Sequence, residues 1–128
     1  MRLSKIAKTL ALAGLLAACG AASAEKTQLL VYTALETDQL KAYQEGFNKT
    51  NPDIEIKWVR DSTGVITAKL LAEKANPQAD AVMGVAAYSL ALLDKQGMLI
   101  PYAPLNLDAI MSQYRDKKTP PAWFGMDV

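Results

Sequence analysis

The residues best suited to chemistry are Ser62, Thr63 and Gly64, which lie between a predicted strand and a predicted helix. Residues 54–59 alternate between apolar and polar side chains, as a strand does, and residues 65–74 place apolar side chains on one helical face. Serine and threonine commonly cap helix starts, and glycine lets another group approach the backbone closely. A helix start with free N–H groups and two hydroxyls suits an anion, so this turn is either a plain cap or one wall of an anion site.

The elements around this turn predict an α/β fold. Apolar or alternating runs predict strands, and apolar residues at helical spacing predict helices. The predicted strands cover residues 28–33, 54–59, 79–85 and 120–126, and the predicted helices cover residues 38–48, 65–74, 89–96 and, more weakly, 107–114. The βαβαβα order predicts a doubly wound, mainly parallel sheet with right-handed crossovers and flanking helices.

The candidate binding residues lie in the turns that follow the first three strands. In a parallel sheet such turns meet at one edge, where ligands bind. We expect three helix starts to face one crevice there and to form an anion cage without any lysine or arginine. Plain capping and packing are the alternative roles of these residues. The candidates are Thr33, Ala34, Glu36, Ser62, Thr63, Gly64, Ala87 and Tyr88.

For several side chains outside the turns, the sequence predicts structural roles. Leu40, Tyr43 and Phe47 share one face of the first predicted helix, so we expect them to pack in the core. Asp80 falls inside the third predicted strand. A buried carboxylate without a partner is costly, which favours a structural hydrogen bond over a catalytic role for Asp80.

Residues 1–24 have the layout of a bacterial secretory signal. Basic residues open the segment, and the apolar run over 6–18 is too short to span a bilayer. The small residues at 22–24 fit an ordinary signal peptidase, whereas the run ending at Cys19 resembles a lipobox, in which the cysteine is lipidated. Both alternatives place the folded part, residues 25–128, in the periplasm, with or without a lipid anchor.

The composition argues against several classes of protein. The chain has no histidine and one cysteine, so histidine-based triads, an internal disulfide and cysteine metal clusters are excluded. Nucleotide-binding glycine motifs are absent, and without the basic signal the chain is slightly acidic, which argues against nucleic acid as a partner. We expect no metal, no cofactor and no catalytic residue. Asp61, Ser62 and Thr63 superficially resemble a phosphatase nucleophile motif, but Thr63 stands where a second aspartate is needed.

Four stretches together resemble the periplasmic solute-binding proteins of ABC importers, in the branch that includes iron(III)-binding proteins. Within that branch the chain looks most similar to 2-aminoethylphosphonate-binding proteins. The stretches are Val31–Glu36, Trp58–Gly64, Leu70–Asp80 and Pro121–Val128.

The resemblance implies a type II periplasmic binding protein with two α/β lobes and a ligand held between them. It also implies delivery of that ligand to a membrane permease. Family members are about three times as long as residues 25–128. We therefore expect this chain to be an amino-terminal piece that holds the first lobe, without the second, and to be a monomer.

The resemblance leaves two solutes in competition. Iron-binding relatives place a histidine after the first strand and a glutamate in the turn after the second, and this chain has neither, since Gly64 stands about where the glutamate falls. That difference favours 2-aminoethylphosphonate or a related phosphonate over ferric iron. Glu36 and Tyr88 are candidates to contact the ammonium group of such a ligand. A small phosphate-processing enzyme is the alternative of another class.

Overall fold

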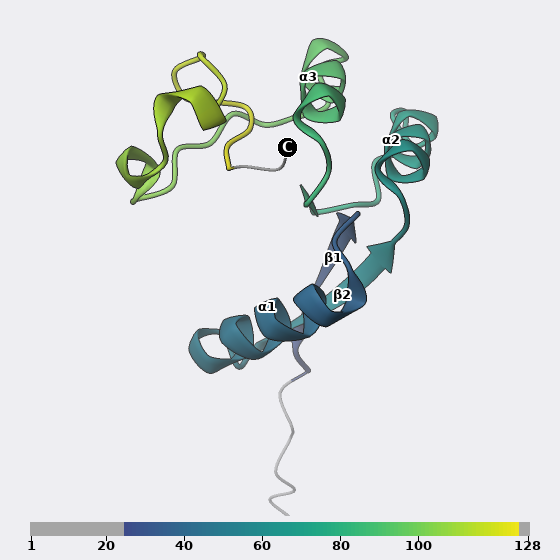
Figure 1. The fold of residues 1–128 in the computed structure, drawn as a ribbon. Coiled ribbons are helices and arrows are strands. Elements are labelled where there is room, and N and C mark those ends of the chain that lie inside the picture. Colours follow the sequence, from purple (N-terminus) through teal and green to yellow (C-terminus); the bar gives the residue numbers. More distant parts are fainter. Residues whose placement is uncertain (1–24, 126–128) are drawn as a thin grey trace, which may run out of the picture.

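The fold is given by a computed structural model that describes residues 25–125 (Figure 1). The predicted signal, residues 1–24 with Cys19, and residues 126–128 lie outside the described residues. Among residues 25–125, every helix is too short or too polar to cross a membrane.

Three of the four predicted strands form one parallel sheet in the order β2-β1-β3. The strands are β1 (Thr27–Thr33), β2 (Ile54–Arg60) and β3 (Ala81–Met83). Thr33, at the end of β1, pairs with Arg60 on one side and with Met83 on the other, so all three strands end at the same edge. Because the second strand lies on one side of the first and the third on the other, the chain reverses direction across the sheet, as a doubly wound fold requires.

Three of the four predicted helices form, and each follows one of the strands along the chain. They are α1 (Thr37–Thr50), α2 (Thr63–Ala72) and α3 (Ala87–Lys95). α1 packs on β2, and α2 lies beside α3, as Figure 1 shows. Gly97 has a φ of +69°, which ends α3 in the left-handed conformation that glycine tolerates best.

The core lies on the face of the sheet that α2 and α3 cover. Tyr32, Ile66 and Val85 are buried together, and Leu70 and Leu90 pack against them. Successive residues of a strand point to opposite faces, so Val31, which is also buried, belongs to the face away from this cluster. Both faces of β1 are therefore covered, which explains its continuous apolar sequence.

The core prediction for α1 is confirmed for one residue and wrong for another. Leu40 is 7% exposed, whereas the Tyr43 side chain is 54% exposed. Phe47 is half-buried. The helix presents a narrow apolar stripe to the sheet, so a residue at the stripe's margin stays in solvent.

Asp80 forms the predicted structural hydrogen bond, but outside the strand. It is exposed and lies just before β3, where its Oδ2 accepts a hydrogen bond of 2.8 Å from the backbone N–H of Leu30. The backbone N–H of Asp80 in turn donates to the Leu30 carbonyl at 2.9 Å. This pair of bonds fixes where β3 joins β1.

The chain after α3 contradicts two predictions. The expected helix over 107–114 consists of two separate 3₁₀ turns, Leu107–Ala109 and Ser112–Tyr114. The expected strand over 120–126 is, in its described part, a single antiparallel bridge between Phe124 and Arg115. Prolines at the start of that segment lack the N–H group that a sheet ladder needs, which accounts for the second error.

Candidate functional site

The turn after β1 is stabilised by a hydrogen bond to the hydroxyl group of Thr33. Thr33 is fully buried, and its Oγ1 accepts a hydrogen bond of 3.1 Å from the backbone N–H of Leu35. Glu36 precedes α1, and its backbone N–H donates to Gln39 Oε1 at 2.9 Å. Thr33 therefore shapes the turn from inside, while Glu36 is exposed to solvent.

The turn after β2 presents free donors at its helix start. Ser62 is the cap of α2, and its Oγ accepts a long bond of 3.4 Å from the backbone N–H of Val65. The backbone N–H of Ser62 donates to Asp61 Oδ1 at 2.7 Å. The backbone N–H groups of Thr63 and Gly64 have no hydrogen-bond partner within residues 25–125. A Cβ placed at Gly64 would meet nothing within 4 Å, so the backbone there is open to approach.

The turn after β3 packs directly against the first turn. Gly84 has a φ of +63°, and a Cβ there would lie 2.2 Å from Cγ of Leu35. Beyond it, α3 begins at Ala87, and Tyr88 has a side chain that is 71% exposed. Ser89 is fully buried, and its Oγ has no partner within the described part of the chain.

The structure brings the three predicted turns together at the carboxyl edge of the sheet. The backbone N–H of Asp61 donates to the carbonyl of Thr33 at 3.1 Å, which joins the second turn to the first. The contact between Leu35 and Gly84 joins the third turn to the first. Among the candidates, Thr33 is buried, Ala34 and Thr63 are half-buried, and the exposed ones are Glu36, Ser62, Gly64, Ala87 and Tyr88.

An arginine that is not among the predicted site residues lies at this edge. Arg60 ends β2, its Nε donates to the carbonyl of Leu35 at 2.7 Å, and its Nη2 forms an ion pair with Glu36. Arg60 therefore brings a cation to the edge where the sequence predicts an anion cage without lysine or arginine, and that cage stays a prediction. Arg60 and Thr33 are neighbours in the register of β1 and β2, so strand pairing was the signal that could have placed Arg60 beside the first turn.

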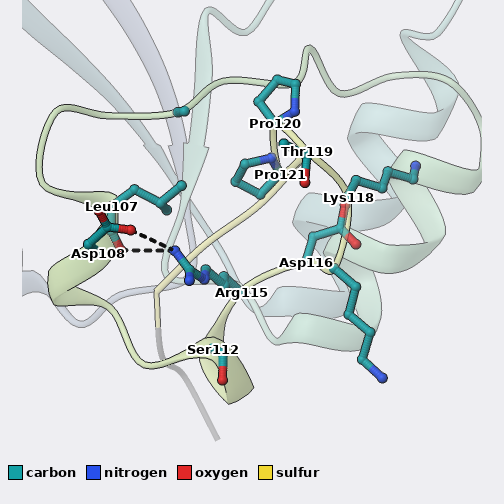
Figure 2. Close-up of a pocket in the computed structure, with 11 residues that line it drawn as sticks. Leu107, Asp108, Ser112, Arg115, Asp116, Lys118, Thr119, Pro120 and Pro121 are labelled. Carbon is teal, nitrogen blue, oxygen red and sulfur yellow. Dashed lines mark hydrogen bonds and ion pairs between the residues drawn. The ribbon is translucent and has the colours of Figure 1, made fainter.

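One surface pocket lies away from the three turns. It has a volume of about 540 Å³ and is formed by the irregular chain after α3 (Figure 2). Arg115 points across it, with Nη1 at 3.2 Å from the Leu107 carbonyl and 3.8 Å from the Asp108 carboxylate. A second pocket of about 420 Å³ lies at the other end of β2, between Ile54 and Gln44. The predicted turns line neither of these two pockets.

The described residues do not form a metal cluster. Residues 25–125 contain no group of three or more histidine, cysteine, aspartate or glutamate side chains placed to hold a metal ion. The donors at the three turns are backbone N–H groups, hydroxyls and one guanidinium. Such donors suit an oxyanion.

Comparison with known proteins shows the family of this chain. The model of the family described as bacterial extracellular solute-binding protein matches residues 33–127. A probable ABC transporter periplasmic-binding protein, y4fP of Sinorhizobium fredii, is 42% identical over 62 residues, which are 48% of this chain and 17% of that protein.

Solved structures share the same fold. The periplasmic binding protein AfuA of Actinobacillus pleuropneumoniae, solved with fructose-6-phosphate bound, matches with a TM-score of 0.65 and 28% identity over 71% of this chain. Iron-bound HitA of Pseudomonas aeruginosa has a TM-score of 0.65 and 19% identity over 71% of this chain. The match to HitA concerns the fold alone. The described chain has the fold of one lobe of a type II periplasmic binding protein, and it spans 28% of AfuA and 29% of HitA.

Proposed function

Because the chain belongs to the bacterial extracellular solute-binding protein family, we propose that it is the substrate-binding component of an ABC importer and that its three turns form half of an anion site. The observation that carries the proposal is the joining of the turns at one sheet edge. The bond from Asp61 to Thr33 and the packing of Leu35 on Gly84 hold that edge together.

The proposed solute is a phosphonate, with 2-aminoethylphosphonate as the leading candidate. A phosphonate group has three oxygens that accept hydrogen bonds, and helix starts supply N–H donors together with a favourable dipole. The free N–H groups of Thr63 and Gly64, and the hydroxyl of Ser62, match that demand. AfuA, which is 28% identical to this chain, holds fructose-6-phosphate, whose phosphoryl group has the same tetrahedral shape.

We place the solute between this lobe and a second one. Five of the eight candidate residues are exposed at the sheet edge, and this chain spans 28% of AfuA. In the proposed protein a second lobe closes over the edge and completes the donor set, and the loaded monomer then delivers the solute to a membrane permease. Thr33 and Ala34 shape the floor of the site, while Ala87 and Tyr88 form its third side.

The proposed location is the periplasm, reached by means of the signal in residues 1–24. Cys19 decides whether a lipid anchor remains after export. Metabolic labelling with palmitate tests this step: labelling that disappears in Cys19→Ser identifies a lipoprotein. A cut after Ala24 instead releases an unlabelled chain that begins at Glu25.

A titration followed by NMR tests the proposed solute. The backbone amide signals of the 128-residue chain are recorded with increasing methylphosphonate, 2-aminoethylphosphonate, a phosphate ester and ferric citrate. We expect saturable shifts at Thr63, Gly64, Ala87 and Tyr88 with the phosphonates. If only ferric citrate shifts the signals, iron replaces the phosphonate as the proposed solute. If phosphate is released from the ester, the chain is an enzyme. If none of the four compounds shifts the signals, the proposed anion site is rejected.

A further inference from the structure

Arg60 is the cationic side chain tied to the first turn of the proposed anion site, and it is already engaged there. Its Nε donates to the Leu35 carbonyl at 2.7 Å, and its Nη2 contacts the Glu36 carboxylate. The carbonyl is fixed by the turn, because the N–H of Leu35 is bonded to Thr33. One side of the guanidinium is thus anchored to backbone, and the other is paired with a side chain.

The two contacts of Arg60 differ in how easily they exchange. The Glu36 side chain is 71% exposed and the Arg60 side chain is 37% exposed. Exposed ion pairs contribute little net stability, since water and salt compete for both charges. Glu36 also forms the capping box of α1, in which its side chain accepts from the backbone N–H of Gln39 and Gln39 Oε1 accepts from the backbone N–H of Glu36. The Glu36 carboxylate can therefore release the guanidinium while it keeps its place at the start of α1, and the contact of Arg60 with the Leu35 carbonyl stays.

The position of Arg60 links the first and second turns. Its backbone lies directly before Asp61, whose N–H is bonded to Thr33, while its guanidinium reaches the carbonyl of Leu35. A guanidinium has five N–H donors in a fixed fork, and the contacts to Leu35 and Glu36 occupy only part of it. The fork matches two oxygens of a phosphonate or phosphate better than any single lysine does.

We propose that Arg60 determines the preference of this site for anions and that Glu36 is its counter-ion in the empty lobe. An arriving phosphonate replaces the Glu36 carboxylate on the guanidinium, while the Leu35 carbonyl keeps the guanidinium in place. Glu36 then weakens the binding of every anion, whether or not the anion carries an ammonium group. This inference rests on the proposed function and gives Glu36 a role opposite to that of an ammonium ligand.

The two roles of Glu36 make opposite predictions for two phosphonates. If Glu36 is a counter-ion, removing its charge frees Arg60 and strengthens the binding of methylphosphonate, which has no ammonium group. If Glu36 binds an ammonium group, the same change weakens the binding of 2-aminoethylphosphonate and leaves methylphosphonate unaffected. Glu36→Gln therefore separates the two roles when both compounds are titrated.

The test compares matched variants of the whole 128-residue chain by NMR titration with both phosphonates. We expect Glu36→Gln to lower the Kd for methylphosphonate several-fold. Arg60→Gln is expected to raise it about tenfold or more, as the loss of a charge-assisted bidentate contact predicts. Arg60→Lys keeps the positive charge and loses the forked arrangement of donors. Its Kd for methylphosphonate is expected to lie between those of the wild type and Arg60→Gln. Glu55→Gln and Lys57→Gln are the controls, because they break another exposed ion pair on the same strand and are expected to bind as wild type does.

Each outcome bears on one of the two proposals. If the wild-type chain shows no phosphonate-dependent shifts, the proposed function fails and the inference fails with it. If the wild type binds but Arg60→Gln binds equally well, the function stands and the role of Arg60 is rejected. A selective loss of 2-aminoethylphosphonate binding in Glu36→Gln identifies Glu36 as an ammonium ligand and rejects the exchange. The dispersion of the amide spectrum shows in each case that the variant is folded.

Discussion

The side chain of Leu35 occupies the space in which Gly84 would carry a Cβ atom. A Cβ built on Gly84 lies 2.2 Å from Leu35 Cγ and 2.5 Å from Leu35 Cδ2. Gly84 also has a φ of +63°, which side-chain-bearing residues rarely adopt. The contact sets how the turn after β3 sits against the turn after β1, and so it sets two sides of the candidate site.

Gly84→Ala is therefore expected to damage both the fold and the site. Strain from the positive φ and the clash with Leu35 together predict a loss of about 1–3 kcal/mol in the free energy of unfolding. Urea denaturation followed by circular dichroism measures it. The control is Gly46→Ala in α1, where a Cβ meets nothing within 4 Å and where alanine stabilises a helix by about 1 kcal/mol. Equal stability of Gly84→Ala and wild type would contradict the packing of these turns.

The sequence alone was sufficient for the sheet and its helices, because local patterns determine them. A continuous apolar run indicates β1 and an alternation of apolar and polar side chains indicates β2. A short turn of polar or small residues separates each of these strands from the helix that follows it. Tyr43 was misplaced because helical periodicity identifies a face without giving its width. The segment from 120 to 126 was misplaced because a strand needs a partner, and partners are not visible in a local pattern.

The candidate site was predictable to the level of its turns and not to the level of its contacts. The rule that turns meet at the carboxyl edge placed Ser62 and Tyr88 on one side of the sheet. It did not show that Thr33 is buried or that Arg60 reaches Glu36, since both facts depend on register and on side-chain direction. The packing of Leu35 on Gly84 likewise depends on three-dimensional contact between distant turns.

Tyr32→Phe is expected to weaken the attachment of α2 to the sheet. The Tyr32 side chain is 2% exposed, and its hydroxyl donates to Glu73 at 3.0 Å, with Lys69 Nζ 5.2 Å from the ring centre. Burial, together with the bond to Glu73, raises the pKa of Tyr32. Loss of one hydrogen bond predicts a decrease of about 0.5–1.5 kcal/mol in the free energy of unfolding. Tyr43→Phe, at an exposed position on α1, is the control. If both substitutions change the free energy of unfolding equally little, the Tyr32 hydroxyl does not contribute to the stability of the fold.

Stability is expected to fall in acid as Glu73 becomes protonated. The hydrogen bond from Lys69 holds the pKa of Glu73 below its ordinary value of 4.5. A carboxyl with a lower pKa in the folded state adds stability that is fully present above pH 4.5 and is lost as the pH falls through the folded pKa. The urea concentration at the midpoint of unfolding, determined at several pH values between 6 and 3, measures this loss of stability. The stability of Glu73→Gln should depend less on pH in this range than the stability of the control Glu45→Gln. If the two variants show the same dependence on pH, Glu73 does not cause the loss of stability in acid.

The hydroxyls that open α2 are expected to contribute to anion binding beyond their role as a cap. Ser62→Ala with Thr63→Ala removes two hydroxyls from the edge and leaves the free N–H groups of Thr63 and Gly64 in place. We expect a loss of about tenfold in phosphonate affinity, the value of one hydrogen bond to a charged group. Loss of the cap costs about 0.5–2 kcal/mol of stability, so affinity is measured by NMR titration at a temperature where the spectrum shows a folded chain. Thr50→Ala is the control, because it removes a hydroxyl from the far end of α1. Unchanged affinity in the double variant would restrict the anion site to backbone donors and Arg60.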